Sequence, residues 1–312
     1  MLMRHLIILL LCTLAPLYVS GHPGDGLGVD SKGNIYFTDV NARTLWKVEV
    51  NGGLRAIVTN RWAHGLSIDG LDRVWLEVEV DSTHYTVSRI ETDGTETHIL
   101  GPLERGLEFY GVNIVADTDG NLYFPHSDPP QFFASGIRRR SPDGRVTLLA
   151  GSGEYGRRDG QGTEARFAGI NAMRFGPDGR IYVVDADAIR GVSLDGRVTT
   201  LICDIRVENP EDQPFDNGNP NVSNRLYGLD VGRDGAIYVA YHGNRRVLKL
   251  DGSKAEVVYR STKPWSPVGV ALWDEKIVIK ESGLEPGSSQ AGPRIRLLRP
   301  VGTLTTIATV GT

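Results

Sequence analysis

A short pattern recurs along the chain and constrains its fold more than any other feature. It consists of a short apolar run, a tight turn of the Asp-Gly type and a second run rich in β-branched and aromatic residues, as at positions 173–185. Self-similarity of this kind is the signature of a repeat architecture, in which each copy forms one structural unit. The sequence holds six copies, the last of them degenerate and one residue shorter, which start at Gly26, Gly65, Ile114, Met173, Gly228 and Gly269.

Each copy predicts a four-stranded antiparallel unit. The Asp-Gly turn favours a hairpin because glycine accepts a positive φ without steric cost. Two further strand-like runs follow the hairpin, at positions 44–50 and 54–59 in the first copy. Beyond the N-terminal segment, no stretch longer than about ten residues shows helical periodicity. Four strands repeated six times predict an all-β fold, a six-bladed β-propeller of four-stranded antiparallel blades.

The predicted propeller spans residues 22–312. The first repeat begins close behind the N-terminal segment, which leaves no spare strand there to complete the last blade. We therefore expect the sixth blade to take all four strands from the C-terminal part of the chain and to meet the first blade by side-chain packing. The predicted blades fall at about residues 24–60, 63–101, 110–151, 169–203, 226–261 and 267–311.

Residues 1–21 have the order of a secretory signal peptide. Arg4 precedes an apolar run at positions 6–11, and small residues lead to Gly21, after which we expect cleavage. The apolar run is shorter than the ~20 residues that span a bilayer. We expect an exported protein, secreted or periplasmic, without a retained membrane anchor. An uncleaved signal-anchor is the alternative.

Composition narrows the class of partner. Lys and Arg number 34 against 38 Asp and Glu, which gives a formal net charge of −4, and 40% of the residues are hydrophobic. That apolar share excludes wholesale disorder, and the absence of a basic footprint argues against a nucleic-acid partner. The mature chain keeps Cys203, which we expect to be a small buried residue of a strand and no nucleophile. We expect a monomer.

The middle of the chain resembles a known repeat family. Positions 151–167 form a Gly-rich linker with Asp-Gly and Ala-Arg-Phe, and strand-like runs follow at 178–185 and 195–201. These segments resemble NHL repeats, and the repeats over residues 24–311 resemble the six-bladed propellers of the SMP-30/gluconolactonase superfamily. The resemblance implies sugar-lactone hydrolases, lyases or non-catalytic ligand-binding propellers. A fold of this kind does not choose among them.

Propeller geometry predicts where a site would lie. The second strand of each blade runs back to the channel mouth at which the first strand began, so two columns of side chains should surround one mouth. Glu77 and His242 lie one residue from the first of these columns. The ends of the second strands supply Asp39, Val78, His126, Asp185, Tyr241 and Glu281, and the positions before the first strands supply Asp25, His64, Val112, Asn171, Tyr227 and Val268.

These columns admit a metal-dependent interpretation. Carboxylate and amide oxygens could hold one divalent cation (Ca, Zn or Mn), with His126 or His64 as the base that acts on water. The lactonase-type propellers place a metal-binding Glu at the opening of the first blade, where Asp25 stands in this sequence. The candidate metal ligands are Glu281, Asp185, Asn171, Asp39 and Asp25. The alternative is that Asp39 and Asp185 are the structural Asp of the repeat, which accepts N–H bonds from loops.

The remaining polar and aromatic positions predict ligand binding. We expect an exported NHL-type propeller that binds a small molecule or a protein partner at the channel mouth. Long insertions at 126–136, 204–226 and 282–293 emerge on the same side and mark it as the working face. The alternative is a metal-dependent hydrolase of a lactone or ester, with a lyase as the third option. The predicted ligand-binding residues are Tyr241, Tyr227, His242, Trp265 and Glu77.

Overall fold

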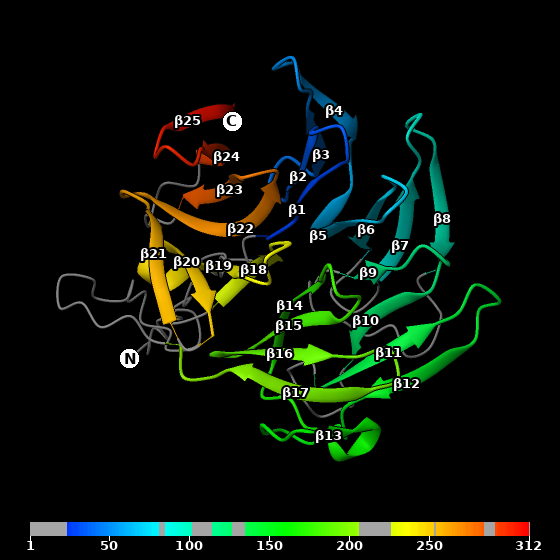
Figure 1. Ribbon diagram of the computed structural model, residues 1–312. Helices are drawn as coiled ribbons and strands as arrows, with labels where there is room; N and C mark the ends of the chain where they lie inside the picture. The colour runs from blue at the N-terminus through cyan, green and yellow to red at the C-terminus, as the bar shows by residue number, and fades with distance from the viewer. Residues whose placement is uncertain are drawn as a thin grey trace, which may run out of the picture.

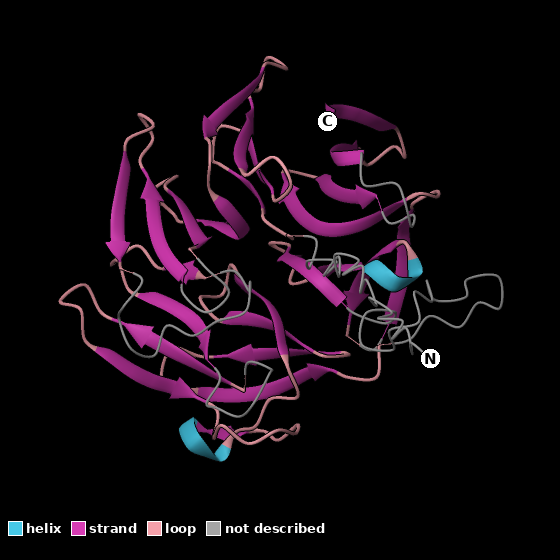
Figure 2. Cartoon of the chain, turned by 180° about the vertical axis from the view of Figure 1, so that it is seen from behind, coloured by secondary structure: helices cyan, strands magenta, loops and turns pink. Residues whose placement is uncertain are grey.

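The protein is a six-bladed β-propeller, as the repeat predicts. Six antiparallel sheets surround a common centre in the computed structural model, and the first sheet lies beside the last (Figure 1). Strands dominate the part of the chain that is described, and the helical turns in it are short (Figure 2). The predicted signal peptide lies outside the described residues. These are 24–80, 85–101, 114–126, 135–205, 226–252, 254–283 and 291–311.

The first three sheets follow the chain in order, each from an inner to an outer strand. The first contains β1 (Leu27–Val29), β2 (Ile35–Asp39), β3 (Thr44–Val48) and β4 (Leu54–Val58). The second contains β5 (Trp62–Ile68), β6 (Val74–Glu79), β7 (Tyr85–Ile90) and β8 (Glu96–Leu100). The third contains β9 (Val115–Ala116), β10 (Leu122–His126), β11 (Gly136–Arg140) and β12 (Val146–Ala150).

The last three sheets repeat this arrangement, with one addition. The fourth contains β14 (Ile170–Phe175), β15 (Ile181–Asp185), β16 (Ala188–Val192) and β17 (Arg197–Ile202), and β13 (Gly160–Gln161) joins its outer edge. The fifth contains β18 (Leu226–Val231), β19 (Ile237–Tyr241), β20 (Arg246–Asp251) and β21 (Lys254–Arg260). The sixth contains β22 (Trp265–Trp273), β23 (Lys276–Gly283), β24 (Ala291–Leu298) and β25 (Leu304–Gly311).

The hairpin between the first two strands of a blade is fixed by its aspartate. In the first blade Asp30 Oδ1 accepts bonds from the backbone N–H groups of Lys32 (3.1 Å) and Asn34 (2.8 Å). Gly33 occupies the position that requires a positive φ, at 85°. This combination explains why the Asp-Gly turn of the sequence repeat predicts the inner hairpins correctly.

The core lies between the blades. Each interface between neighbouring sheets has its own apolar cluster among the described residues. At the junction of the first and last blades, Phe37 packs with Val278 and Ile295, all of them fully buried. The apolar faces of the sheets therefore serve mainly to hold each blade against the next.

The ring closes without a shared strand, as predicted, and a buried lysine bridges the junction. The Lys280 ammonium on β23 donates to the carbonyls of Gly24 (2.6 Å) and Gly26 (3.3 Å) and to Thr38 Oγ1 (3.1 Å) in the first blade. Thr38 in turn donates to the carbonyl of His64 in the second blade (3.1 Å). These bonds join β23 to the segment before β1 and to β2, and join β2 to β5 of the second blade.

A clasp, defined here as residues 151–169, covers the outer edge of the fourth blade. Its strand β13 pairs with β17, although the sequence predicts only a loop there. The fully buried Arg190 holds the clasp through the carbonyls of Arg158 (3.0 Å) and Arg166 (3.1 Å) and through Asp159 Oδ1 (2.9 Å). The clasp thus supplies three of the acceptors of this buried guanidinium, and Asp185 on β15 supplies another.

The prediction that Cys203 is buried is wrong. The residue follows the last residue of β17, and its side chain is exposed as a free thiol. The apolar run on which the prediction rests ends one residue earlier, so the thiol falls outside the packed part of the blade.

The inner strands approach each other at glycines, which yields a first prediction. A Cβ on Gly269 would lie 2.6 Å from the backbone oxygen of Asp25 in the first blade. Overpacking of this kind destabilises by about 1–3 kcal/mol. We expect Gly269→Ala to lose that much in urea unfolding. Gly101→Ala, where nothing described lies within 4 Å, should stay within about 0.5 kcal/mol. Equal losses would contradict a tight inner ring.

Candidate ligand site at the channel mouth

The two predicted columns meet in space. The described registers pair Ala63 with Val78 and Ile170 with Asp185 on the first and second strands of their blades. Leu226 pairs with Tyr241 in the same way. Members of the second-strand column therefore lie opposite residues that adjoin the first-strand column. Val112 lies outside the described residues, as do most of the three insertions.

A β-bulge marks the first-strand column. The ladder between the first two strands shifts register beside each of four members in the described part of the chain. Bulges bend the strand and re-aim the side chain, and they are common next to functional sites. The members that the bulges remove from the regular ladder are His64, Asn171, Tyr227 and Val268.

Several members of the second-strand column are held by arginines of their own blade. The arginines come from the third strands, β11, β16 and β24. Each donates a hydrogen bond to the column residue at the end of the second strand of its blade. Because a guanidinium only donates, the imidazole in one of these pairs accepts through Nε2. The pairs are His126–Arg138 at 2.7 Å, Asp185–Arg190 at 2.7 Å and Glu281–Arg294 at 2.5 Å.

Both oxygens of Glu281 have donors. Arg294 Nε holds Oε2, while the hydroxyls of Tyr259 (2.9 Å) and Ser261 donate to Oε1. The glutamate is fully buried. Its deviation from the repeat is therefore explained by a charge-paired network inside the sixth blade.

Asp185 is satisfied in the same manner. Its Oδ1 accepts from the backbone N–H groups of Ala168 (2.7 Å) and Gly169 (2.9 Å), and its Oδ2 accepts from Arg190. Burial raises the pKa of the carboxyl, against the lowering effect of Arg190. Asp39 likewise accepts from the backbone N–H of Ala42 (3.0 Å). These contacts agree with the structural role that the sequence left open for Asp39 and Asp185.

The described residues do not fit a metal centre. Among them, no three His, Cys, Asp or Glu side chains gather as cation ligands would. Glu281 and Asp185 already have full sets of donors, and Asn171 donates toward the carbonyl of Leu226 at 3.5 Å. A divalent cation at the mouth remains a prediction.

Asp25 differs from the other carboxylates. It is buried at the opening of the first blade, and its Oδ1 has no hydrogen-bond partner in the described part of the chain. Burial raises the pKa of this carboxyl to about 7, although Lys280 and Arg174 act to lower it. Burial likewise lowers the pKa of Lys280 to about 8, against the effect of Asp25. Asp25 therefore titrates near neutral pH.

His64 is oriented by a carboxylate from its own blade. Its Nε2 lies 3.3 Å from Glu79 Oε2, and both side chains are largely buried. Its carbonyl accepts from the backbone N–H of Gly26 in the first blade (3.0 Å). Glu77 is buried in the neighbouring strand β6. His64 thus lies at the junction between the first and second blades.

The fifth and sixth blades supply aromatic groups. The Tyr227 ring meets the imidazole of His242 edge-on at 4.9 Å. His242 follows β19 in a short 3-10 turn, η2 (His242–Asn244), and its Nδ1 lies 3.1 Å from the carbonyl oxygen of Pro267. Arg294 stacks over the Trp265 ring at 4.3 Å. Tyr241 is buried at the end of β19.

The structure thus separates the predicted site residues into two groups. Asp25, His64 and Tyr227 belong to the first-strand column, and His64 also contacts Glu79 of its own blade. His242 follows the second strand β19 and contacts Pro267 of the next blade. The residues with partners inside their own blades are His126, Asp185, Glu281 and Asp39.

Sequence reasoning missed two cations. Lys280 interrupts the apolar run of β23, which was an available signal. Arg174 on β14 pairs with Asp230 on β18 (3.2 and 3.3 Å), and Asp230 also accepts from the backbone N–H of Leu272 on β22 (2.8 Å). Only the folded ring brings these three strands together.

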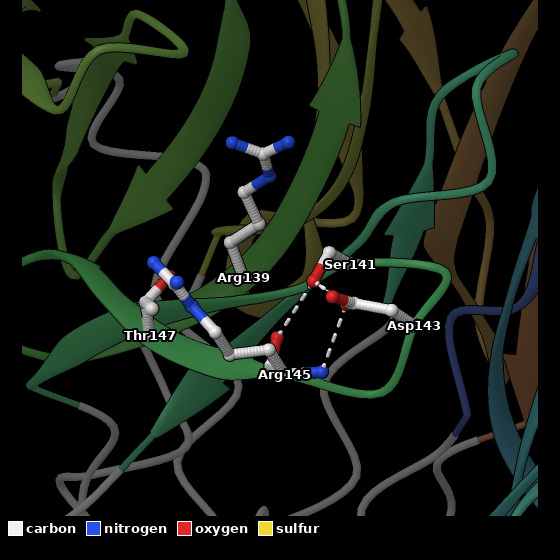
Figure 3. A pocket seen from close by; sticks show the side chains of 5 residues that line it. All are labelled: Arg139, Ser141, Asp143, Arg145 and Thr147. Carbon is white, nitrogen blue, oxygen red and sulfur yellow. Dashed lines mark hydrogen bonds between the residues drawn. The ribbon is translucent and has the colours of Figure 1, made fainter.

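A surface cavity of about 230 Å³ lies on the outer hairpin of the third blade (Figure 3). The β11–β12 turn forms it, at the end of β11 remote from His126. Its polar groups bond locally: Ser141 Oγ donates to Asp143, and Asp143 Oδ1 accepts from the backbone N–H of Arg145 (3.2 Å). Arg139 is held by Asn121 Oδ1 (2.8 Å). The cavity is separate from the mouth.

Several solved structures share the fold of this chain at low sequence identity. No protein-family model and no curated protein sequence matches the chain. A gluconolactonase from Xanthomonas campestris shares 13% identity at TM-score 0.56, covering 83% of this chain and 82% of that one. A calcium-binding regucalcin from Agrobacterium tumefaciens shares 17% at TM-score 0.55, covering 82% and 81%. Virginiamycin B lyase from Staphylococcus aureus shares 14% at TM-score 0.52, covering 92% and 85%.

These similarities establish an SMP-30/gluconolactonase-like six-bladed fold, as the sequence predicts. The identities are too low to carry an activity. The assignment of the repeats to the NHL type remains a prediction. Among the described residues, no helix has the length and apolar character needed to cross a membrane.

A second prediction concerns Glu281. Arg294→Met leaves its carboxylate buried without the guanidinium, which should destabilise the protein by about 3–5 kcal/mol in urea unfolding. The double variant with Glu281→Gln should recover part of that loss, because the uncompensated charge is then removed. Additive losses in this cycle would contradict a direct pair.

A third prediction follows from Asp25. Because its folded pKa (about 7) exceeds its ordinary value of 3.8, the folded state binds the extra proton between these values. Its contribution to the free energy of unfolding therefore falls as pH rises through that window. Asp25→Asn should remove this decline, measured as the difference from wild type in denaturant unfolding. The exposed Asp119→Asn should leave it unchanged. A decline that persists in Asp25→Asn would contradict the assignment.

Proposed function

We propose that the protein binds a small ligand at the channel mouth. One observation carries this proposal: the buried carboxyl of Asp25 keeps an oxygen without a partner in the described residues and titrates near pH 7. Burying a polar atom without a partner is unfavourable, so native proteins usually satisfy such atoms. Strongly perturbed carboxyls also gather at functional sites.

The proposal also covers the location, the partners and the oligomeric state of the protein. The N-terminal segment 1–21 supports export to a secreted or periplasmic location, without a retained anchor. A net charge of −4 supports a partner other than nucleic acid. A protein partner at the mouth is the alternative to a small molecule, and we propose a monomer.

A fourth prediction tests binding. We expect at least one neutral compound from a panel of sugar lactones, including glucono-1,5-lactone, to raise the melting temperature of the mature protein. Asp25→Asn should weaken the shift, whereas Asp143→Asn in the outer cavity should preserve it. No shift with any compound, or equal shifts in both variants, would contradict a mouth site.

A hydrolase or lyase is the second candidate. The observation that favours it is the same pKa of about 7, which lets Asp25 act as acid or base at neutral pH. His64, oriented by Glu79, would be the complementary base. Solved neighbours include a gluconolactonase and a virginiamycin B lyase, one structure of which is a catalytically inactive variant with quinupristin.

Turnover and metal content separate the two candidates. For an enzyme, opening of glucono-1,5-lactone or quinupristin should fall about 10²–10⁴-fold in Asp25→Asn. Elemental analysis of the dialysed protein tests the predicted cation. About one divalent ion per chain, lost in Asp25→Asn, would support the metal-dependent hydrolase. Ligand binding without turnover would support the ligand-binding propeller and contradict the enzyme.

A further inference from the structure

His242 has a fixed proton position. Its Nδ1 lies 3.1 Å from the carbonyl oxygen of Pro267, and a carbonyl oxygen only accepts. The proton of the neutral ring therefore sits on Nδ1, and Nε2 presents a lone pair. This arrangement assigns the tautomer from geometry alone.

The imidazole is also held in place. Tyr227 contacts it edge-on, with an interplanar angle of 77°. Ser266 Oγ donates to the carbonyl of His242 at 2.5 Å, so the backbone of η2 is tied to β22. A ring fixed on both sides is pre-organised to receive a hydrogen bond in one direction.

Nε2 is an acceptor without a donor. The side chain is 1% exposed, and Nε2 has no hydrogen-bond partner among the described residues. Burial lowers the pKa of His242 to about 4, and Arg245 acts in the same direction. The ring is therefore neutral at physiological pH, and the unmet group is an acceptor.

The surrounding charges oppose a cation. Arg245 reaches the sixth blade through the carbonyl of Trp265 (2.7 Å). On the other side of β22, Lys280 and Arg174 act on Asp25, the second buried acceptor without a partner at this level. Arg174 is paired with Asp230, and Lys280 lies near the carboxylates of Asp25 and Asp39. Arg245 is the positive group that acts on His242 itself. A neutral donor suits this environment better than a metal ion.

We propose that His242 Nε2 accepts a hydrogen bond from a hydroxyl or N–H group of a neutral ligand at the mouth. This inference rests on the ligand site proposed above and deepens it by naming the chemistry of the ligand. His242 is then a specificity residue, which selects ligands that donate at this point.

The first test is the tautomer, measured in protein with ¹⁵N-labelled imidazole by long-range ¹H–¹⁵N spectra between about pH 5 and pH 8. We expect a neutral ring with its proton on Nδ1 throughout. A charged ring at the neutral end of that range, or the proton on Nε2, would overturn the inference.

The second test uses matched variants and the neutral compounds that bind in the screen. His242→Asn retains a donor for Pro267 but has no atom at Nε2, whereas His242→Gln can place an amide oxygen there. We expect His242→Asn to weaken binding about tenfold and His242→Gln to stay within a few-fold, because one hydrogen bond is at stake. Similar melting temperatures of the two unliganded variants exclude a folding effect.

The outcomes separate this inference from the proposed function. Equal affinities of both variants for a compound that depends on Asp25 would overturn the role of His242 and leave the mouth site intact. A shift of the Nε2 signal with calcium, manganese or zinc ions alone would replace the neutral ligand by a cation. Failure of every neutral compound to bind wild type would overturn both proposals.

Discussion

The ring of blades depends on one junction, where a buried ammonium replaces a shared strand. The charged ammonium of Lys280 lies in the interface between the sixth and first blades. It donates hydrogen bonds to two backbone carbonyls and a hydroxyl. A buried charge persists only where such partners are supplied. Phe37 and Ile295 belong to the apolar cluster of the same junction. Asp25 lies at this junction, so its unusual titration is a property of ring closure as much as of the mouth.

The two columns of the mouth differ in how their side chains are held. Second-strand ends such as Glu281 and Asp185 turn into their own blades, where arginines of the third strands neutralise them. First-strand positions such as His64 and Tyr227 leave the ladder at bulges. These arginine pairs fix the second-strand ends of the third, fourth and sixth blades. The role of a polar residue at the mouth can therefore be inferred only when its hydrogen-bond partner is known.

The repeat made the architecture predictable because turn chemistry and strand alternation are local. The six sheets, the inner hairpins and the alignment of His64 with Asn171 and Tyr227 all follow from spacing alone. The partner that each buried carboxylate contacts cannot be predicted from spacing, because that partner is often remote in the chain. Lys280 bonds to Gly24, 256 residues away, and no local pattern specifies such a contact. Strand β13 was not predicted for a related reason. The segment that carries it is held by contacts with the buried Arg190, which is remote in the sequence.

The clasp on the fourth blade has a consequence for self-association. An outer strand with unpaired N–H and C=O groups is a template on which another chain can add a strand, which is a route to aggregation. Strand β13 pairs with Arg197 and Val198 of β17, so this part of the edge is not open to a strand of a second molecule. Arg190 also joins the clasp to Asp185 at the end of β15. Proteolytic nicking within residues 151–169 would therefore expose this edge and leave the buried guanidinium with Asp185 as its remaining acceptor. One side chain thus links the outer edge of the fourth blade to the end of its second strand.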